Sequence, residues 1–240
     1  PEKMIEGLYY NVQNTMLTTV LIKDNVEIKT IEHLYSALAG LAIDNLIIEI
    51  EGPEIPIMDG SSRPFIFAIQ AAGIKNQSEK RKMVRVKKEI SVFEGDKIAT
   101  LKPYNGSKAT FEIQYNNKMI DATPQIATFD ADVDSYTHVI SRARTFGFEK
   151  DVEALKKKNC ILGGSLDNAI LVNDEEILNV DGLRLNDEFV KHKLLDAIGD
   201  LYLLGHQLVG EYYGFKSGHT LNNRLIRALM ADKDAWEYTE

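Results

Sequence analysis

The sequence DEFVKHKLLDAIGDLYLLG, residues 187–205, has apolar side chains at the spacing of an amphipathic helix. It forms the centre of the longest predicted helix, residues 186–208. Within it, His192, Asp196 and Asp200 are spaced four residues apart, so their side chains project from one side of the helix. A histidine and an aspartate one turn apart can bind one metal ion together. A polar stripe facing solvent is the alternative interpretation, because such pairs are common.

A faint internal repeat relates this helix to an earlier predicted helix, residues 31–41. His33 is followed seven residues later by Gly40, and His192 is followed seven residues later by Gly199. Strand-rich runs precede helices in both halves of the chain. This order predicts an α+β fold of two domains with similar topology; the packing of paired helices between β-sheets in each domain is what the family resemblance described below implies.

The predicted boundary between the domains is the charged stretch at residues 77–82. The first domain is expected over residues 1–80 and the second over residues 81–240. Because the opening residues do not resemble a native start, we expect the first domain to be truncated at its N-terminus.

The predicted elements follow from alternating β-formers, helical periodicity and turn residues. Strands are expected at residues 15–22, 26–28, 46–50, 84–93, 97–102, 109–115, 143–148, 168–172 and 211–215. Helices are expected at residues 31–41, with Thr30 as the N-cap, and at residues 64–72, 133–140, 151–158, 186–208 and 221–230.

The composition excludes several classes of protein. The 240 residues are 44% hydrophobic and carry a net charge of −8, which argues against a general nucleic-acid binder. The single cysteine, Cys160, allows no disulfide within the chain, suits a cytoplasmic location and is interpreted as a packing residue. The sequence contains no apolar run long enough to span a bilayer.

Two further segments carry candidate chemistry. In TIEHL, residues 30–34, Glu32 precedes His33, and a helix would place its carboxylate beside a metal ion bound by that histidine, as a general base requires. In YYGFKSGHTLNN, residues 212–223, His219 lies in a glycine-flanked loop before a helix, where Lys216 could meet a phosphate. An ordinary amphipathic helix start and a simple surface turn are the respective alternatives.

Two histidines and one carboxylate with an open position describe a catalytic zinc site rather than a structural one. His33, His192 and Asp196 satisfy this description, and Asp200 is better placed as a partner of His219. His138 and His206 are interpreted as structural or surface residues, and the HExxH pattern of many peptidases is absent. Polar groups satisfied within the core of a structural domain are the alternative.

Several long blocks resemble one enzyme family. They are TIEHLYSALAGLAIDN at residues 30–45, PEIPIMDGSSRPF at 53–65, SRARTFGF at 141–148, LGGSLDNAI at 162–170, DEFVKHKLLDAIGDLYLLGH at 187–206 and KSGHTLNN at 216–223. In these blocks the chain is similar to the UDP-3-O-acyl-N-acetylglucosamine deacetylases, zinc enzymes of lipid A biosynthesis in Gram-negative bacteria. The resemblance implies hydrolysis of the substrate's 2-acetamido group with release of acetate. A non-catalytic sugar-nucleotide or acyl-chain binding protein on the same scaffold is the competing hypothesis.

The resemblance also implies roles for individual residues. It assigns the zinc ligands to His33, His192 and Asp196, with iron(II) as the alternative metal, and the catalytic roles to Glu32, Thr145, Lys193, Asp200 and His219. It assigns substrate contacts to Leu17, Lys97, Tyr115, Phe146, Phe148, Lys216 and Gly218.

A β-α-β insert at about residues 146–172 is implied as a passage for the acyl chain. Its expected lining residues are Val152, Leu155, Ile161, Ala169 and Leu171, and packing among themselves is the alternative. The implied partner is the UDP-linked acylated glucosamine alone, and a monomer in the cytoplasm, near the inner face of the membrane, is expected.

Overall fold

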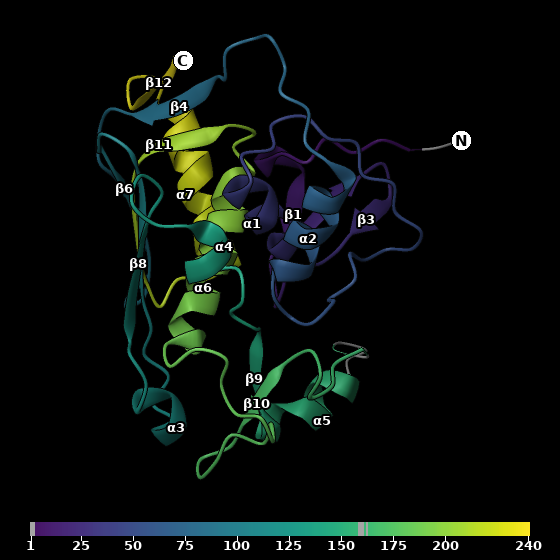
Figure 1. The fold of residues 1–240 in the computed structure, drawn as a ribbon. Helices are drawn as coiled ribbons and strands as arrows, with labels where there is room; N and C mark the ends of the chain where they lie inside the picture. The colour runs from purple at the N-terminus through teal and green to yellow at the C-terminus, as the bar shows by residue number, and fades with distance from the viewer. Residues whose placement is uncertain (1–2, 158–160, 162) are drawn as a thin grey trace.

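The computed structural model describes residues 3–157, 161 and 163–240 and shows an α+β fold, which confirms the predicted class. Figure 1 shows helices α6 and α7 against one side of a seven-stranded sheet, with α1 next to α6. The three-stranded sheet and helix α2 lie beyond α1 (Figure 1). Helices are therefore packed between two sheets, while the division into domains at residue 80 stays a prediction.

The large sheet is built around strand β11, whose nine residues are all buried or half-buried. β11 runs parallel to β7, with Tyr212 opposite Ala109, and antiparallel to β6, with Tyr212 opposite Leu101. Its first residues pair with β4 instead. The strands of this sheet are β4 (Met83–Val86), β5 (Ile90–Glu94), β6 (Lys97–Lys102), β7 (Ser107–Glu112), β8 (Ile126–Asp130), β11 (Gln207–Phe215) and β12 (Trp236–Thr239).

The small sheet has the order β1-β2-β3 and is antiparallel throughout. Its strands are β1 (Val12–Asn14), β2 (Val20–Lys23) and β3 (Val26–Ile28), and a short 3-10 helix, η1 (Tyr9–Asn11), precedes them. A bend between β1 and β2 replaces most of the strand predicted at residues 15–22, and Leu17 there has a φ of 71°. A side chain with positive φ cannot continue a strand, which explains the break.

The helices follow the predicted order with shifted ends. Their bounds are α1 (Glu32–Gly40), α2 (Arg63–Ala72), α3 (Lys118–Asp121), α4 (Tyr136–Val139), α5 (Glu149–Lys157), α6 (Glu188–Tyr202) and α7 (His219–Ala231). Thr30 does not cap α1, because its hydroxyl donates to Glu54 at 2.6 Å and Ile31 occupies the N-cap position. Helix α6 ends six residues before the predicted Leu208, which already belongs to β11.

Other predicted elements need correction. Residues 46–50 form no strand; Leu46 and Ile47 are exposed there, and β-propensity without a pairing partner does not make a strand. The strand predicted at residues 84–93 is two strands, β4 and β5, in different parts of the sheet. Strands β8 and β12 and the short helix α3 were not predicted, and the helix expected at residues 133–140 is only the four residues of α4.

A β-α-β arm projects from the body of the molecule (Figure 1). Strand β9 (Phe146–Phe148) and strand β10 (Ile170–Val172) pair in parallel, and α5 connects them. This agrees with the β-α-β insert expected at residues 146–172. Lys158, the last residue of the helix predicted at residues 151–158, lies outside the described residues, and so does Cys160.

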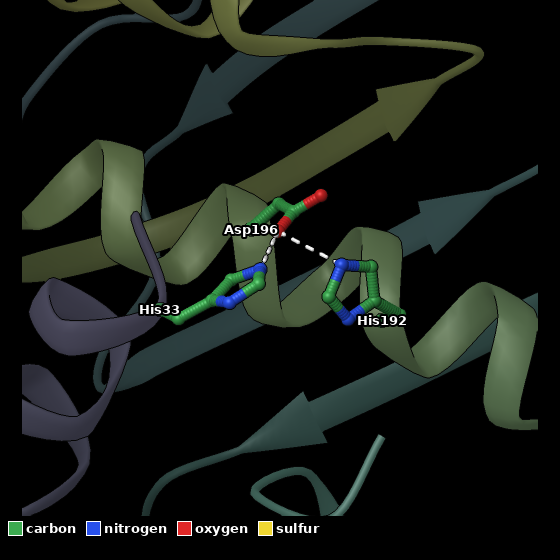
Figure 2. Close-up of side chains that lie close together, drawn as sticks. All are labelled: His33, His192 and Asp196. Carbon is green, nitrogen blue, oxygen red and sulfur yellow. Dashed lines mark ion pairs between the residues drawn. The ribbon is translucent and has the colours of Figure 1, made fainter. Parts of the chain in front are cut away.

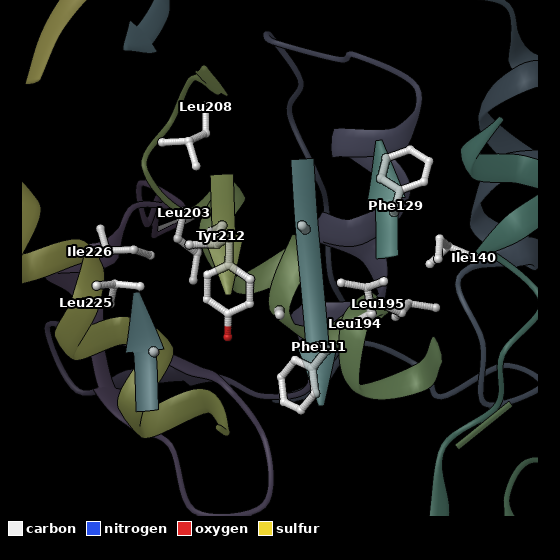
Figure 3. Close-up of a cluster of buried hydrophobic side chains, with 14 of the residues drawn as sticks. Phe111, Phe129, Ile140, Leu194, Leu195, Leu203, Leu208, Tyr212, Leu225 and Ile226 are labelled. Carbon is white, nitrogen blue, oxygen red and sulfur yellow. The ribbon is translucent and has the colours of Figure 1, made fainter. Parts of the chain in front are cut away.

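The core lies between the large sheet and the helices. Figure 3 shows Phe111 and Tyr212 from the sheet facing Leu194 and Leu195 of α6 and Leu225 of α7. These side chains are almost fully buried, and burial of each contributes about 1.5–3 kcal/mol before the entropy cost of ordering. Among the described residues, no helix is long and apolar enough to cross a membrane.

Candidate active site

The site is built where α1 crosses α6. The Cβ of an alanine at Gly199 would lie 2.1 Å from the backbone oxygen of Glu32, so only glycine permits this approach. Nearby, Ser36 donates a 2.7 Å hydrogen bond from its hydroxyl to the Leu195 carbonyl. The crossing brings the N-terminal turn of α1, with Glu32 and His33, against the middle of α6.

Three potential metal ligands converge at this crossing. Figure 2 shows His33 from α1 and His192 from α6 both facing one carboxylate oxygen of Asp196. Asp196 Oδ1 lies 3.5 Å from His33 Nε2 and 3.3 Å from His192 Nε2, and the ligand atoms all lie within 4.8 Å of one another. All three residues are buried.

The hydrogen bonding of this cluster fits a cation. Asp196 Oδ1 is buried and accepts no well-aligned hydrogen bond from the described residues. His192 Nδ1 lies 3.1 Å from the Ala143 carbonyl, so it carries the proton, and the lone pair on Nε2 faces the cluster. An orphaned carboxylate oxygen between two imidazole nitrogens is a donor set that suits a divalent metal ion.

Electrostatics keep the cluster in its metal-binding form. Burial, opposed by Asp196, lowers the pKa of His192 to about 4, so its imidazole is neutral at pH 7. Burial acts to raise the pKa of Asp196, but the His192 imidazole, which is protonated only below about pH 4, and the charge of Lys193 hold it well below its ordinary value. Lys193 Nζ donates to Asp196 Oδ2 at 2.7 Å, and this carboxylate outweighs burial and raises the lysine pKa. Lys193 is therefore charged beside the cluster.

A second group of side chains lies beside the first. His219 Nδ1 donates to Asp200 Oδ2 at 2.9 Å, while its Nε2 lies 3.7 Å from Glu32 Oε1. Burial acts to lower the pKa of His219, but Asp200 and Glu32 outweigh it and raise that pKa to about 9. Burial raises the pKa of Glu32, although the charge of His219 opposes the shift. The sequence-based pairing of Asp200 with His219 is present in the structure.

Two threonines that the sequence reasoning missed hold these carboxylates. Thr18 Oγ1 and the backbone N–H of Thr19 both donate to Glu32 Oε2 at 3.0 Å, and Thr19 Oγ1 donates to Asp200 Oδ1 at 2.6 Å. The bend after β1 delivers both residues to the site. No pattern within the sequence links this bend to α1 and α6, so only folding reveals it.

Thr145 lies at the base of the arm, next to the segment that contacts His192. Its N–H donates to the Gly60 carbonyl at 2.8 Å, and its carbonyl accepts from Ile170 N–H at 2.8 Å. Gly60 has a φ of +83°, and a Cβ there would lie 2.0 Å from the Asn168 carbonyl, so a larger residue would displace the arm. The neighbouring Arg144 is fixed by a buried ion pair with Glu188 at 2.9 Å.

Three aromatic residues pack together near the candidate metal ligands. Phe146 packs edge-to-face against Tyr115, with ring centroids 5.3 Å apart, and lies 6.3 Å from the His192 ring. Phe148 lies 5.9 Å from the Tyr115 ring. The structure thus gathers Tyr115, Phe146 and Phe148, which are distant in sequence, beside the ligands.

The remaining predicted contact residues lie farther out. Lys216 pairs with Asp96 in the β5–β6 turn, and Lys97 lies 3.4 Å from Glu94 in the same hairpin. Among the described residues, no hydrogen bond or ion pair joins either lysine to the metal cluster. Gly218 is the N-cap residue of α7 with an ordinary extended backbone and open space at its Cβ, so the fold does not demand glycine there.

Leu17 is exposed in the bend beside Thr18, on the site's outer edge. Among the other histidines, His206 packs edge-to-face against Tyr238 with ring centroids 5.3 Å apart, which fits the structural role expected for it.

A cavity of about 140 Å³ lies away from this chemistry. Its walls include Gly40, Ile198, Tyr202 and His206, at the C-terminal ends of α1 and α6. It contains none of the candidate site residues, so the chemistry of the side chains identifies the site better than the shape of the cavity.

Comparisons with known proteins agree with the geometry. The family model for LpxC, UDP-3-O-acyl N-acetylglycosamine deacetylase, matches residues 1–231. A UDP-3-O-acyl-N-acetylglucosamine deacetylase of Marinobacter nauticus is 55% identical over 237 residues, which cover 99% of this chain and 78% of that protein. The proteins of the same name from Hahella chejuensis and Alcanivorax borkumensis are 54% and 52% identical, over 95% and 94% of this chain and 75% and 74% of their own lengths.

Proposed function

Since the chain belongs to the UDP-3-O-acyl N-acetylglycosamine deacetylase family, we propose that it hydrolyses the 2-acetamido group of UDP-3-O-acyl-N-acetylglucosamine in lipid A biosynthesis. The products are acetate and a 2-amino sugar that keeps its UDP and acyl groups. The observation that carries this proposal is the convergence of a three-ligand cluster, a buried carboxylate and a charged histidine at one helix crossing.

His33, His192 and Asp196 would hold a zinc ion, with iron(II) as the alternative metal. A bound ion of this kind supplies Lewis acidity towards the acetamide carbonyl and acidifies a water molecule. Lys193 adds a positive charge next to Asp196 and supports the developing oxyanion. The Thr145 hydroxyl, at the base of the arm, is assigned the same task.

Glu32 is the proposed general base. Its Oε2 is held by Thr18 and the Thr19 N–H, which leaves Oε1 free towards His219 and the reacting water. Burial raises its pKa, which strengthens the carboxylate as a proton acceptor. Glu32 adjoins the ligand His33 in sequence but points elsewhere, so it works beside the ion rather than on it.

His219 is the proposed acid. With a pKa raised to about 9 by Asp200 and Glu32, against the effect of burial, it carries a proton on both ring nitrogens at pH 7. Nδ1–H is committed to Asp200, so Nε2–H can stabilise the oxyanion and then protonate the leaving amine. Asp200 keeps that imidazolium charged and oriented.

The substrate is proposed to approach between the arm and the β5–β6 hairpin. Tyr115, Phe146 and Phe148 offer an apolar surface next to the reacting group, while Leu17, Lys97, Lys216 and Gly218 are assigned to the sugar nucleotide. The acyl chain would follow α5, where Val152 and Leu155 are partly exposed. Ile161, Ala169 and Leu171 complete the proposed passage.

The test is acetate release from the purified protein, measured together with its metal content. Glu32→Gln keeps the acceptor oxygen for Thr18 and Thr19 but removes the base, so we expect kcat to fall by about 10²–10⁴-fold with normal metal loading. Glu49→Gln, at an exposed position, is the matched control and leaves kcat unchanged.

Full activity in Glu32→Gln would contradict the assignment of Glu32 as the general base. A wild-type protein that binds metal and substrate but releases no acetate would favour the non-catalytic binding hypothesis.

A further inference from the structure

We propose that Asn222 is a positioning residue that fixes the Asp200 carboxylate and, through it, the catalytic His219. The expected effect on kcat rests on the proposed function, whereas the positioning of Asp200 by Asn222 rests on the hydrogen bonds alone. Asn222 lies in the first turn of α7, three residues after His219, and is 1% exposed. Neither composition nor any of the motif assignments above gives it a role.

The first contact is with Asp200 itself. Asn222 Nδ2 donates to Asp200 Oδ2 at 2.9 Å, the same oxygen that accepts from His219 Nδ1 at 2.9 Å. Because Asp200 belongs to α6 and Asn222 to α7, this bond joins the two helices directly behind His219. The imidazole and the amide therefore hold one carboxylate oxygen between them.

The orientation of the Asn222 amide is determined by its other partners. Its Oδ1 accepts hydrogen bonds from the Tyr212 hydroxyl and the Ser217 hydroxyl, each at 2.7 Å. A flipped amide would point its oxygen at the Asp200 carboxylate, which has only acceptors to offer. The hydroxyl pair and the carboxylate together leave one favourable orientation.

Asp200 therefore accepts three hydrogen bonds, which reach both of its oxygens. Its Oδ2 accepts from His219 and Asn222, and its Oδ1 accepts from Thr19 Oγ1 at 2.6 Å. Donors from the segment just before β2 and from α7 thus surround a carboxylate that is 1% exposed. A buried carboxylate held by hydrogen bonds on both oxygens keeps its rotamer, so His219 Nε2 stays aimed at Glu32 Oε1.

Asn222→Asp is the sharpest variant, because it keeps the shape and the acceptor for Tyr212 and Ser217. It replaces the N–H donor by an oxygen that faces Asp200. We expect kcat to fall about 10–100-fold, the loss typical of an outer partner in a metal site, with KM and metal content changed less than about threefold.

Asn223→Asp is the matched control. It makes the same exchange one residue later on the same helix, where the side chain bonds Arg227 and the Tyr9 carbonyl instead of Asp200. We expect kcat to stay within about twofold of the wild type, since most changes away from a network have small effects. Ser217→Ala, a milder change that removes one donor to Asn222 Oδ1, should lower kcat several-fold in the same direction.

A double-mutant cycle separates positioning from general damage. If Asn222 acts through His219, then Asn222→Asp lowers kcat little further in a His219→Ala background. An equal fold-loss in both backgrounds would overturn the proposal.

The NMR resonances of the His219 ring in the metal-loaded protein give a readout that needs no turnover. They should shift in Asn222→Asp and not in Asn223→Asp, and unchanged resonances in Asn222→Asp would also overturn the proposal. Absence of acetate release by the wild type would instead refute the proposed function. The NMR comparison would still test whether Asn222 positions His219.

Discussion

The crossing of α1 and α6 and the β9-α5-β10 arm contribute to the same site in opposite ways. At the crossing, His33, His192 and Asp196 are all buried, and helix packing is so close that Gly199 has no room for a Cβ. In the arm, helix α5 has no buried residue. The difference shows that the candidate ligands are held rigidly by the packed core, whereas the helix of the arm remains open to solvent.

The two regions also differ in how far their charged side chains are buried. At the crossing, the charged groups are buried or half-buried and pair with one another, as Lys193 does with Asp196 and His219 with Asp200. On α5, Lys156 and Lys157 are exposed to solvent. Buried charges shift one another's pKa strongly, while exposed ones are screened. Changes at the crossing should therefore affect chemistry, and changes in the arm should affect binding.

The largest effect is expected from Asp196→Ala. It removes one of three proposed ligands and leaves the half-buried Lys193 without its partner, which should lower the free energy of unfolding. Metal content should fall sharply, and kcat/KM should fall more than the roughly 100-fold cost of losing an outer partner. Metal analysis, thermal unfolding and acetate release measure these changes.

Asp187→Ala is the control on the same helix, because its pair with Lys191 is more exposed and should contribute at most about 1 kcal/mol. Normal metal content in Asp196→Ala would contradict the ligand assignment.

The second effect tests the close packing itself. In Gly199→Ala the new Cβ would lie 2.1 Å from the Glu32 carbonyl oxygen, so the helices must move apart. We expect a loss of about 1–3 kcal/mol in the free energy of unfolding. Activity should fall by up to about 10²-fold, because Glu32 is displaced. Denaturant unfolding and steady-state kinetics are the measurements.

The arm supplies the matched change, Gly163→Ala, where a Cβ meets nothing within 4 Å. Its stability should stay within about 0.5 kcal/mol of the wild type. Equal losses in the two variants would remove the distinction between the regions.

The third effect is a pH dependence that belongs to the crossing alone. Because the pKa of His219 is raised to about 9, the protonated form is lost as the pH rises through that value. We expect kcat/KM to decline above about pH 9, whereas the stability that the imidazolium contributes is lost progressively as the pH rises from the ordinary histidine pKa of 6.5 to about 9. Asp200→Asn removes the main raising charge, so the decline should move to lower pH.

Lys150→Ala, in the arm, should leave the pH profile in place. If Asp200→Asn left the pH profile of kcat/KM unchanged, the decline would not be due to titration of His219.

The smallest effect is expected in the arm. Leu155→Ser removes apolar surface from a partly exposed position on α5. KM for the long-chain acylated substrate should rise several-fold, since a few buried methylenes are worth about 1–3 kcal/mol. The kcat value and the unfolding temperature should hardly change, and Glu153→Ser at an exposed position of α5 is the control. A fall in kcat with unchanged KM would contradict the proposed division of roles.

Local sequence signals predicted those parts of the fold that local physics controls. Helix α2 begins within one residue of its predicted start because Pro64 suits a first turn, and it ends at Gly73 as predicted. Strand β6 has its predicted bounds because its alternation lies between two turns. Residues 46–50 have equal β-propensity but no partner, and β8 and β12 depend on partners far away in sequence. Pairing over such distances leaves no local pattern.

The sequence by itself determined the α+β fold class and, through long matching blocks, the family. It also named the candidate site residues His33, His192, Asp196, Glu32 and His219. Spacing within one helix revealed the relation of His192 to Asp196, because a helix has a fixed pitch. Only the tertiary structure showed that Thr18 and Thr19 hold the carboxylates and that Asn222 locks Asp200. Those contacts join segments up to about 180 residues apart, and hydrogen bonds between such segments form only after packing has brought them together.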